Sequence, residues 1–188
     1  MSDFEDIIYE KKGHVCTLTL NRPDQLNALS PTVYHELYQA CQDIEADNEI
    51  RVVIFKGTGK AFCAGADLKA MQPSLEKSSL AVRYLEMCHR TYNAIEDLSK
   101  PTIAQVHGMC LAGGIELIES CDIIIAADTA RIGDQHSARG LMPGGGGTQR
   151  LPRQMNFRKA KELLLTGEWM SAEDAYQWGL INKVVPED

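Results

Sequence analysis

The sequence feature that most constrains the fold is an alternation of short apolar runs with helical stretches, separated by turns that contain glycine or proline. Residues 14–20, 51–56, 102–106 and 122–127 have the composition and spacing of strands. Ser30 can cap a helix that begins at Pro31, and the apolar residues after it have helical spacing. The same signals predict helices over 76–98, around 157–165 and from Ser171 to near Gly179. Strands that alternate with helices in this way predict an α/β fold with parallel pairing and right-handed crossovers.

Length and charge narrow the class of protein further. A chain of 188 residues fits one domain, which we place over residues 1–188, and 44% hydrophobic residues can build its core. The longest apolar stretch, Ile123 to Ala127, is far too short for a membrane span, so no membrane partner is expected. The net charge of −7, without a long basic run, argues against a nucleic-acid partner. The acidic N-terminus is not a signal peptide, so a cytoplasmic protein is expected, or a mitochondrial matrix protein if a transit peptide was removed.

The six cysteines carry no metal or disulfide signal. They form no C-x-x-C pair, and each lies inside an apolar segment. A disulfide framework is typical of short secreted chains, which this chain does not resemble. We therefore expect reduced, mostly buried cysteines and no metal site.

Three glycine-rich turns, at 61–67, 108–114 and 144–147, each follow a predicted strand, and none has the pattern of a nucleotide-binding loop. The middle turn opens a helix, whose first N–H groups have no partner within the helix. The N–H of Gly113 would then point outward at the positive end of the helix dipole, which suits an oxyanion. Glu116 lies in the first turn of that helix. It is either a catalytic group beside that N–H or an ordinary acid that stabilises the helix start, and Glu119 could have the second role instead.

Five segments together carry a resemblance to a known family. They are NRPDQLNAL (21–29), KAFCAGADLK (60–69), KPTIAQVHGMCLAGGIE (100–116), PGGGGTQRL (143–151) and LTG (165–167). Their order and spacing resemble the crotonase (enoyl-CoA hydratase/isomerase) superfamily over essentially the whole chain. The resemblance implies a spiral of ββα units that binds an acyl-CoA thioester and needs no cofactor beyond the coenzyme A of its substrate. Members of the family continue with further helices that cap the CoA site and complete a homotrimer or a dimer of trimers. We expect residues 1–188 to be the spiral core alone, with this C-terminal helical region missing.

The resemblance assigns roles to individual positions. The thioester oxygen would lie between the backbone N–H groups of Ala66 and Gly113. The same resemblance implies that coenzyme A is held largely through backbone atoms, by Ala64, Ala66, Asp67, Leu68, Lys69 and Gly113. Lys69 is a candidate contact for a phosphate, although an exposed helical lysine is as often only solvated.

Hydratases of this family use two glutamates, and the resemblance places Glu116 at the first position and His136 at the second. Histidine can exchange a proton at neutral pH, so the pair is chemically workable, but His136 could also be a polar filler. Asp134 is a weaker replacement, because its side chain should point away from the site if the segment is extended. A dehalogenase of this superfamily would need an aspartate within residues 144–147, and this chain has none there. His89 therefore completes no such motif, and we expect it to be a residue on a helix face.

The expected function is hydration of an α,β-unsaturated enoyl-CoA by Glu116 and His136. An isomerase, decarboxylase or hydrolase that uses Glu116 alone remains an alternative, as does an acyl-CoA-binding module without a competent acid–base pair. Several apolar residues line the acyl pocket or belong to the core: Met71, Tyr84, Leu85, Met87, Leu141 and Met142.

Overall fold

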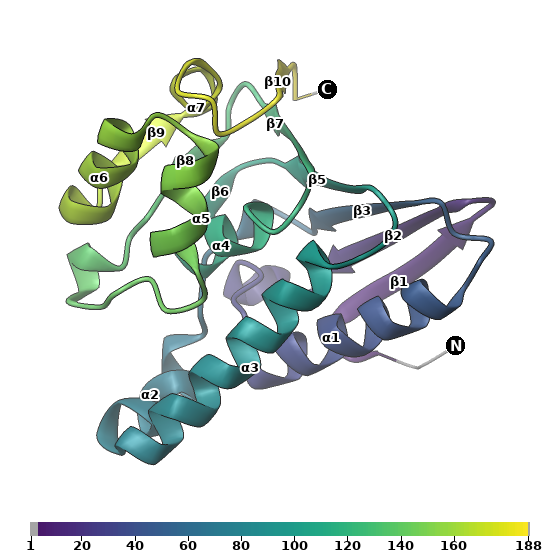
Figure 1. Cartoon of the computed structure of the whole chain (residues 1–188), viewed down its shortest axis with the longest axis horizontal. Helices are drawn as coiled ribbons and strands as arrows, with labels where there is room; N and C mark the ends of the chain where they lie inside the picture. The colour runs from purple at the N-terminus through teal and green to yellow at the C-terminus, as the bar shows by residue number, and fades with distance from the viewer. Residues whose placement is uncertain (1–3, 188) are drawn as a thin grey trace.

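The larger of two β-sheets runs through most of the molecule (Figure 1). The computed structural model describes residues 4–187. Its larger sheet has the order β1-β2-β3-β5-β7-β10. The strands are β1 (Ile7–Lys12), β2 (Val15–Leu20), β3 (Val52–Gly57), β5 (Thr102–Val106), β7 (Ile123–Ala127) and β10 (Lys183–Val185). Only the β1–β2 pair of this sheet is antiparallel, so the parallel pairing expected from the sequence is confirmed for the rest.

The smaller sheet has the order β4-β6-β8-β9. Its strands are β4 (Ala61–Cys63), β6 (Met109–Leu111), β8 (Arg131–Gly133) and β9 (Trp169–Ser171). The pairs β3–β4, β5–β6 and β7–β8 each place their first strand in the larger sheet and their second in the smaller one. Helices follow each pair, which makes the repeated ββα unit of the expected spiral. Two of the glycine-rich turns therefore contain a three-residue strand.

Seven α-helices connect or cover the strands of residues 4–187. They are α1 (Pro31–Ala46), α2 (Leu68–Glu76), α3 (Ser78–Glu96), α4 (Gly113–Ile118), α5 (Gly147–Gln154), α6 (Phe157–Thr166) and α7 (Ala172–Gln177). Helices α1 and α3 pack against each other along one side of the larger sheet, whereas α5, α6 and α7 gather near β8 and β9 (Figure 1). Helix α4 lies between these two groups, so residues from both can reach it.

Local sequence signals account for several helix boundaries. The Ser30 hydroxyl accepts a hydrogen bond from the N–H of Val33, and Pro31 occupies the first turn of α1. Ser171 and Asp174 form a reciprocal capping box at the start of α7. The helix expected over 76–98 is α3, which is two residues shorter at each end. The expectation that 144–147 follows a strand is wrong, because a 3₁₀ turn at Ser137–Arg139 and an irregular segment precede it.

The core lies between the sheets and their helices. It contains all six cysteines as free thiols, and all six are buried, as expected for most of them. The apolar face of α1 contributes Leu37 and Ile44, each at most 1% exposed. In residues 4–187 no helix is both long enough and apolar enough to cross a membrane.

Candidate active site

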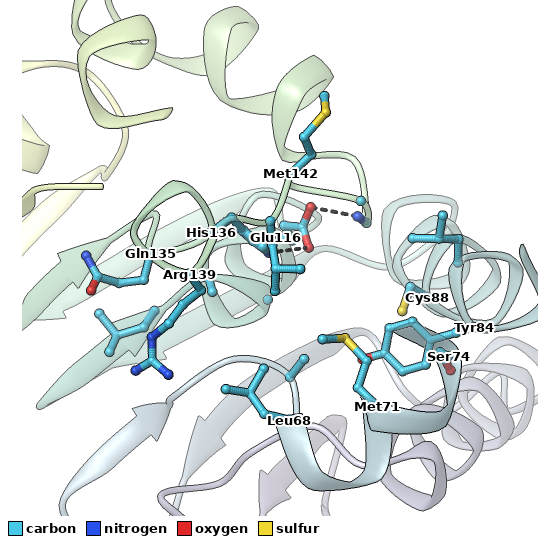
Figure 2. Close-up of a pocket in the computed structure, with 18 of the residues that line it drawn as sticks. Leu68, Met71, Ser74, Tyr84, Cys88, Glu116, Gln135, His136, Arg139 and Met142 are labelled. Carbon is cyan, nitrogen blue, oxygen red and sulfur yellow. Dashed lines mark hydrogen bonds and ion pairs between the residues drawn. The ribbon is translucent and has the colours of Figure 1, made fainter. Parts of the chain in front are cut away.

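A cavity of about 290 Å³ opens between α2, α3 and the loops that follow β4, β6 and β8. Figure 2 shows Leu68 and Met71 of α2 on one side of it, Tyr84 and Cys88 of α3 at one end, and Glu116 with His136 on the opposite side. Most of its lining is apolar. Such a cavity can take up an apolar group while leaving a small number of polar atoms to contact it.

Two backbone N–H groups in the cavity wall belong to Ala66 and Gly113. The isolated bridge between Leu29 and Ala66 uses the N–H groups of Leu29 and Asp67 and leaves that of Ala66 on the other side. A Cβ atom placed on Gly113 would lie only 3.4 Å from the nitrogen of Ala66, so the two segments lie side by side. Among the described residues neither N–H donates a hydrogen bond, and both residues line the cavity.

The backbone around Gly113 is held in an uncommon conformation. Ala112, the residue before the helix, has φ 48° and ψ −114°, which is unfavourable for a residue with a Cβ atom. The hydroxyl of Tyr92 donates a hydrogen bond of 2.9 Å to the carbonyl oxygen of Gly113. Strain of this kind concentrates where the surrounding structure holds a functional backbone group in place. Here α3, through Tyr92, anchors the turn that carries the Gly113 N–H.

Glu116 is 3% exposed, and its two carboxylate oxygens have different surroundings. Oε1 accepts hydrogen bonds from the N–H groups of Gly145 (2.7 Å) and Gly147 (3.0 Å). Oε2 lies 4.0 Å from Nε2 of His136. One oxygen therefore anchors the side chain, and the other faces the histidine, which lies on the same side of the cavity (Figure 2).

The approach of the 144–147 segment to Glu116 requires glycine at position 145. A Cβ atom there would lie 2.3 Å from Cε2 of Tyr92 and 2.6 Å from Oε2 of Glu116. Both distances are far shorter than van der Waals contact. The glycine-rich turn thus allows backbone donors to reach a buried carboxylate.

His136 contacts a second carboxylate, because its Nδ1 lies 3.0 Å from Oδ2 of Asp134. The backbone N–H of His136 also donates to Oδ1 of Asp134 (3.2 Å). The carboxylate of Asp134 does not line the cavity, in keeping with its expected place as the weaker candidate, but the reason differs from the extended segment considered above. His136 has helical φ and ψ angles (−64°, −49°), so side chains at 134 and 136 do not follow the alternation of an extended segment.

Burial and charge shift the pKa values of both side chains. Burial raises the pKa of Glu116, while the imidazole of His136 and the two backbone N–H groups act against that rise. Burial alone would lower the pKa of His136, but the hydrogen bond and the charge of Asp134, followed by the charge of Glu116, raise it above the ordinary value. The pKa values of both groups therefore lie above their ordinary values.

Of the residues expected to contact coenzyme A, some line the cavity and others do not. Ala64, Ala66 and Leu68 line the cavity, but Asp67 does not. The carboxylate of Asp67 instead caps α2 through the N–H of Ala70 and pairs with Arg22 at 3.1 Å. Lys69 lies exposed on α2 near the cavity.

The expected acyl-pocket residues line the cavity with one exception. Met71, Tyr84, Leu85, Leu141 and Met142 all contribute. Met87 instead packs against the core and faces a separate groove between α1 and α3, so it takes the other of the two places considered for it. His89 lies exposed on α3, as expected for a residue on a helix face.

Sequence reasoning missed Tyr92 and the two N–H donors to Glu116. The glycine run at 144–147 is a visible signal, but nothing in it indicates that Glu116 is its partner. Tyr92 is hidden among the apolar positions of α3 and has no motif of its own.

Comparison with known proteins gives a consistent result. The family model described as enoyl-CoA hydratase/isomerase matches residues 10–188. A short-chain-enoyl-CoA hydratase of Clostridium acetobutylicum is 40% identical over 185 residues, covering 97% of this chain and 70% of that protein. A crotonyl-CoA hydratase of Syntrophomonas wolfei is 39% identical over 188 residues, covering 98% and 71%.

Solved structures agree with the sequence relatives. The crystal structure of an enoyl-CoA hydratase from Bacillus anthracis superposes with a TM-score of 0.91 at 38% identity. The match covers 97% of this chain and 70% of that one.

Proposed function

The chain belongs to the enoyl-CoA hydratase/isomerase family, and from this premise we propose that it adds water across the double bond of an α,β-unsaturated acyl-CoA. The observation that carries the proposal is the facing pair of Glu116 and His136, whose Oε2 and Nε2 atoms lie 4.0 Å apart beside the cavity. Hydration needs one group to take a proton from water and another to give a proton to carbon. A carboxylate and an imidazolium meet both needs.

In the proposed reaction Glu116 acts as the base. Its Oε2 takes a proton from water as the water oxygen bonds to the β-carbon, and the π electrons of the double bond move toward the thioester. His136 then gives its Nε2 proton to the α-carbon, which yields the 3-hydroxyacyl-CoA. The proton gained by Glu116 returns to His136, so water is the only reagent consumed. The fixed Oε1 keeps Oε2 aimed at the same point throughout.

The negative charge that develops on the thioester oxygen needs its own donors. The N–H groups of Ala66 and Gly113 are the proposed pair, because both line the cavity and neither has another partner in the described residues. Donors held in place before the reaction do not have to reorient as charge develops, and losing one costs about 3–4 kcal/mol of barrier in comparable sites.

Coenzyme A is proposed to enter along the 64–69 segment. Ala64, Ala66 and Leu68 line the cavity, and Lys69 presents a cation near them that suits a phosphate. The N–H groups of Ala64 and Asp67 already bond to Leu26 and Leu29, and the carbonyl oxygens of Gly65 and Asp67 accept from Leu29 and Met71. The carbonyl oxygens of Ala64 and Ala66 are therefore the proposed acceptors for the adenine amino group and the pantetheine amides.

The test is incubation with crotonyl-CoA in D₂O, followed by mass spectrometry of the acyl-CoA. A product that has gained one water supports hydration. Recovered substrate that carries deuterium would refute hydration and favour an isomerase that uses Glu116 alone. Recovered substrate without deuterium would refute both for this acyl group, and binding of the substrate in that case would favour a non-catalytic acyl-CoA-binding module.

We also propose a homotrimer or a dimer of trimers. Large apolar side chains lie exposed on and around α6 and α7, including Leu165 (76% exposed), Phe157 (56%) and Tyr176 (51%). Apolar surface of this kind commonly marks an interface. Light scattering coupled to size-exclusion chromatography would measure the mass, and a monomer at micromolar concentration would contradict the proposal.

A further inference from the structure

Asp134 is completely buried and lies directly behind His136 as seen from Glu116. We propose that Asp134 is a positioning residue that acts through His136: it binds the Nδ1–H group and thereby holds Nε2 toward Glu116 as the proton donor of the site. This inference rests on the role proposed above for His136. It adds a third member to the pair of Glu116 and His136.

The geometry fixes the ring in two ways. Oδ2 of Asp134 lies 3.0 Å from Nδ1 of His136, and Oδ1 accepts the backbone N–H of the same residue at 3.2 Å. Both the backbone and the ring of His136 are thus tied to one carboxylate. With Nδ1 protonated and bonded, the remaining ring nitrogen is the one that lies 4.0 Å from Oε2 of Glu116.

The fold holds this carboxylate still. Asp134 follows β8 directly, and Gly133, the last residue of β8, is paired with Leu111 of β6 on one side and Trp169 of β9 on the other. Strands paired on both sides move little, so Asp134 has a fixed origin. A side chain carried by a sheet is held in position more precisely than one carried by a loop.

The surrounding charges determine what Asp134 adds. Glu116 lies in α4, and the buried Glu119 is the residue that follows this helix. Arg139 lies on the same turn as His136, and Arg150 of α5 pairs with Glu96 at 2.6 Å. Burial of His136 disfavours the imidazolium, and Asp134 is the largest opposing influence on its pKa. Removing the negative charge of Asp134 should therefore lower the pKa of His136, so that its ring loses its proton at a lower pH.

The substitution Asp134→Asn separates positioning from a purely structural role. Its side-chain oxygen can still accept the N–H of His136 and keep the turn, but the charge is lost and the amide can present a donor to Nδ1. If the variant does not fold, Asp134→Ser keeps an acceptor for the turn and also lacks the charge. The matched control is Asp128→Asn, which makes the same chemical change at an exposed position after β7.

The first readout is the pH titration of His136 by NMR, assigned by comparison with His136→Gln, and it does not require activity. We expect the pKa of His136 to fall by about one unit or more in Asp134→Asn and to stay unchanged in the control. An unchanged pKa in Asp134→Asn would overturn the inference. Because this measurement is independent of turnover, it fails separately from the hydration proposal.

The second readout is a double-mutant cycle on crotonyl-CoA hydration. His136→Gln should lower kcat by about 10²–10⁴-fold. Asp134→Asn should lower kcat by about 10-fold or more and shift the pH profile, but it should have almost no effect when His136 is already Gln. Equal losses in both backgrounds would show that Asp134 does not act through His136, and would overturn the inference.

Discussion

Glu119 is a buried acid that takes no part in the proposed reaction. We predict that replacing it stabilises the folded protein. Glu119 is 1% exposed at the end of α4, and in the described part of the chain neither of its carboxylate oxygens has a hydrogen-bond partner. Burial raises its pKa well above the ordinary value, the charges of Glu116 and Asp134 add to that rise, and Arg150 only partly opposes it. The folded state therefore favours the protonated form of Glu119 more than the unfolded chain does.

The substitution Glu119→Met removes two costs from folding. A neutral buried carboxyl without partners costs about 1–3 kcal/mol by analogy with other buried polar groups, and methionine fills a similar volume. The second cost depends on pH. Because the folded state holds a proton that the unfolded chain releases above the ordinary pKa of glutamate, the wild-type protein loses about 1.4 kcal/mol per pH unit over that range. The variant has no such loss.

The assay is urea unfolding of both proteins at one fixed protein concentration, at pH 5, 6 and 7. The advantage of Glu119→Met should be present at pH 5 and grow by about 1.4 kcal/mol per pH unit until the pH approaches the pKa of the folded state. The difference in unfolding free energy between Glu119→Gln and the wild type should depend on pH in the same way. It should be smaller than that of Glu119→Met, because glutamine keeps a buried polar group. A destabilised methionine variant, or a difference that does not change with pH, would mean that Glu119 is charged and paired, and would refute the reasoning.

Three further predictions concern the site. Glu116→Gln keeps an acceptor for Gly145 and Gly147, so it should lower kcat by about 10²–10⁴-fold while coenzyme A affinity by calorimetry changes little; retained turnover would reduce Glu116 to an acid that stabilises the helix start. Gly145→Ala places a Cβ atom 2.6 Å from Oε2 of Glu116, so turnover should be lost and a crystal structure should show the carboxylate displaced; an unmoved carboxylate would contradict this. Tyr92→Phe leaves the carbonyl of Gly113 without its donor, so unfolding should become easier by about 1–3 kcal/mol and kcat should fall; unchanged stability would show that another group satisfies that carbonyl.

The order of strands and helices can be read from the chain because each signal is local. A buried apolar run, a Ser-Pro start or a capping box involves residues within one or two turns, and these signals locate α1, α3, α6 and α7 closely. The strands of the smaller sheet are hidden inside glycine-rich turns, because three residues are too few to show a period. The relation of Gly113 to Glu116 is also visible, since both lie in the first turn of one helix.

The proposed catalytic pair depends on tertiary structure. Glu116 and His136 belong to α4 and to the turn after β8, and only the parallel pairing of β6 with β8 brings these elements together. The family resemblance indicates which position His136 occupies, but neither its partner nor its orientation. The contact between Asp134 and His136 was not predictable either, because it depends on the helical φ and ψ of His136, which the packed loop determines. A chain encodes its periodic elements through neighbouring residues, whereas the approach of a glycine turn to a buried carboxylate arises only when distant segments pack.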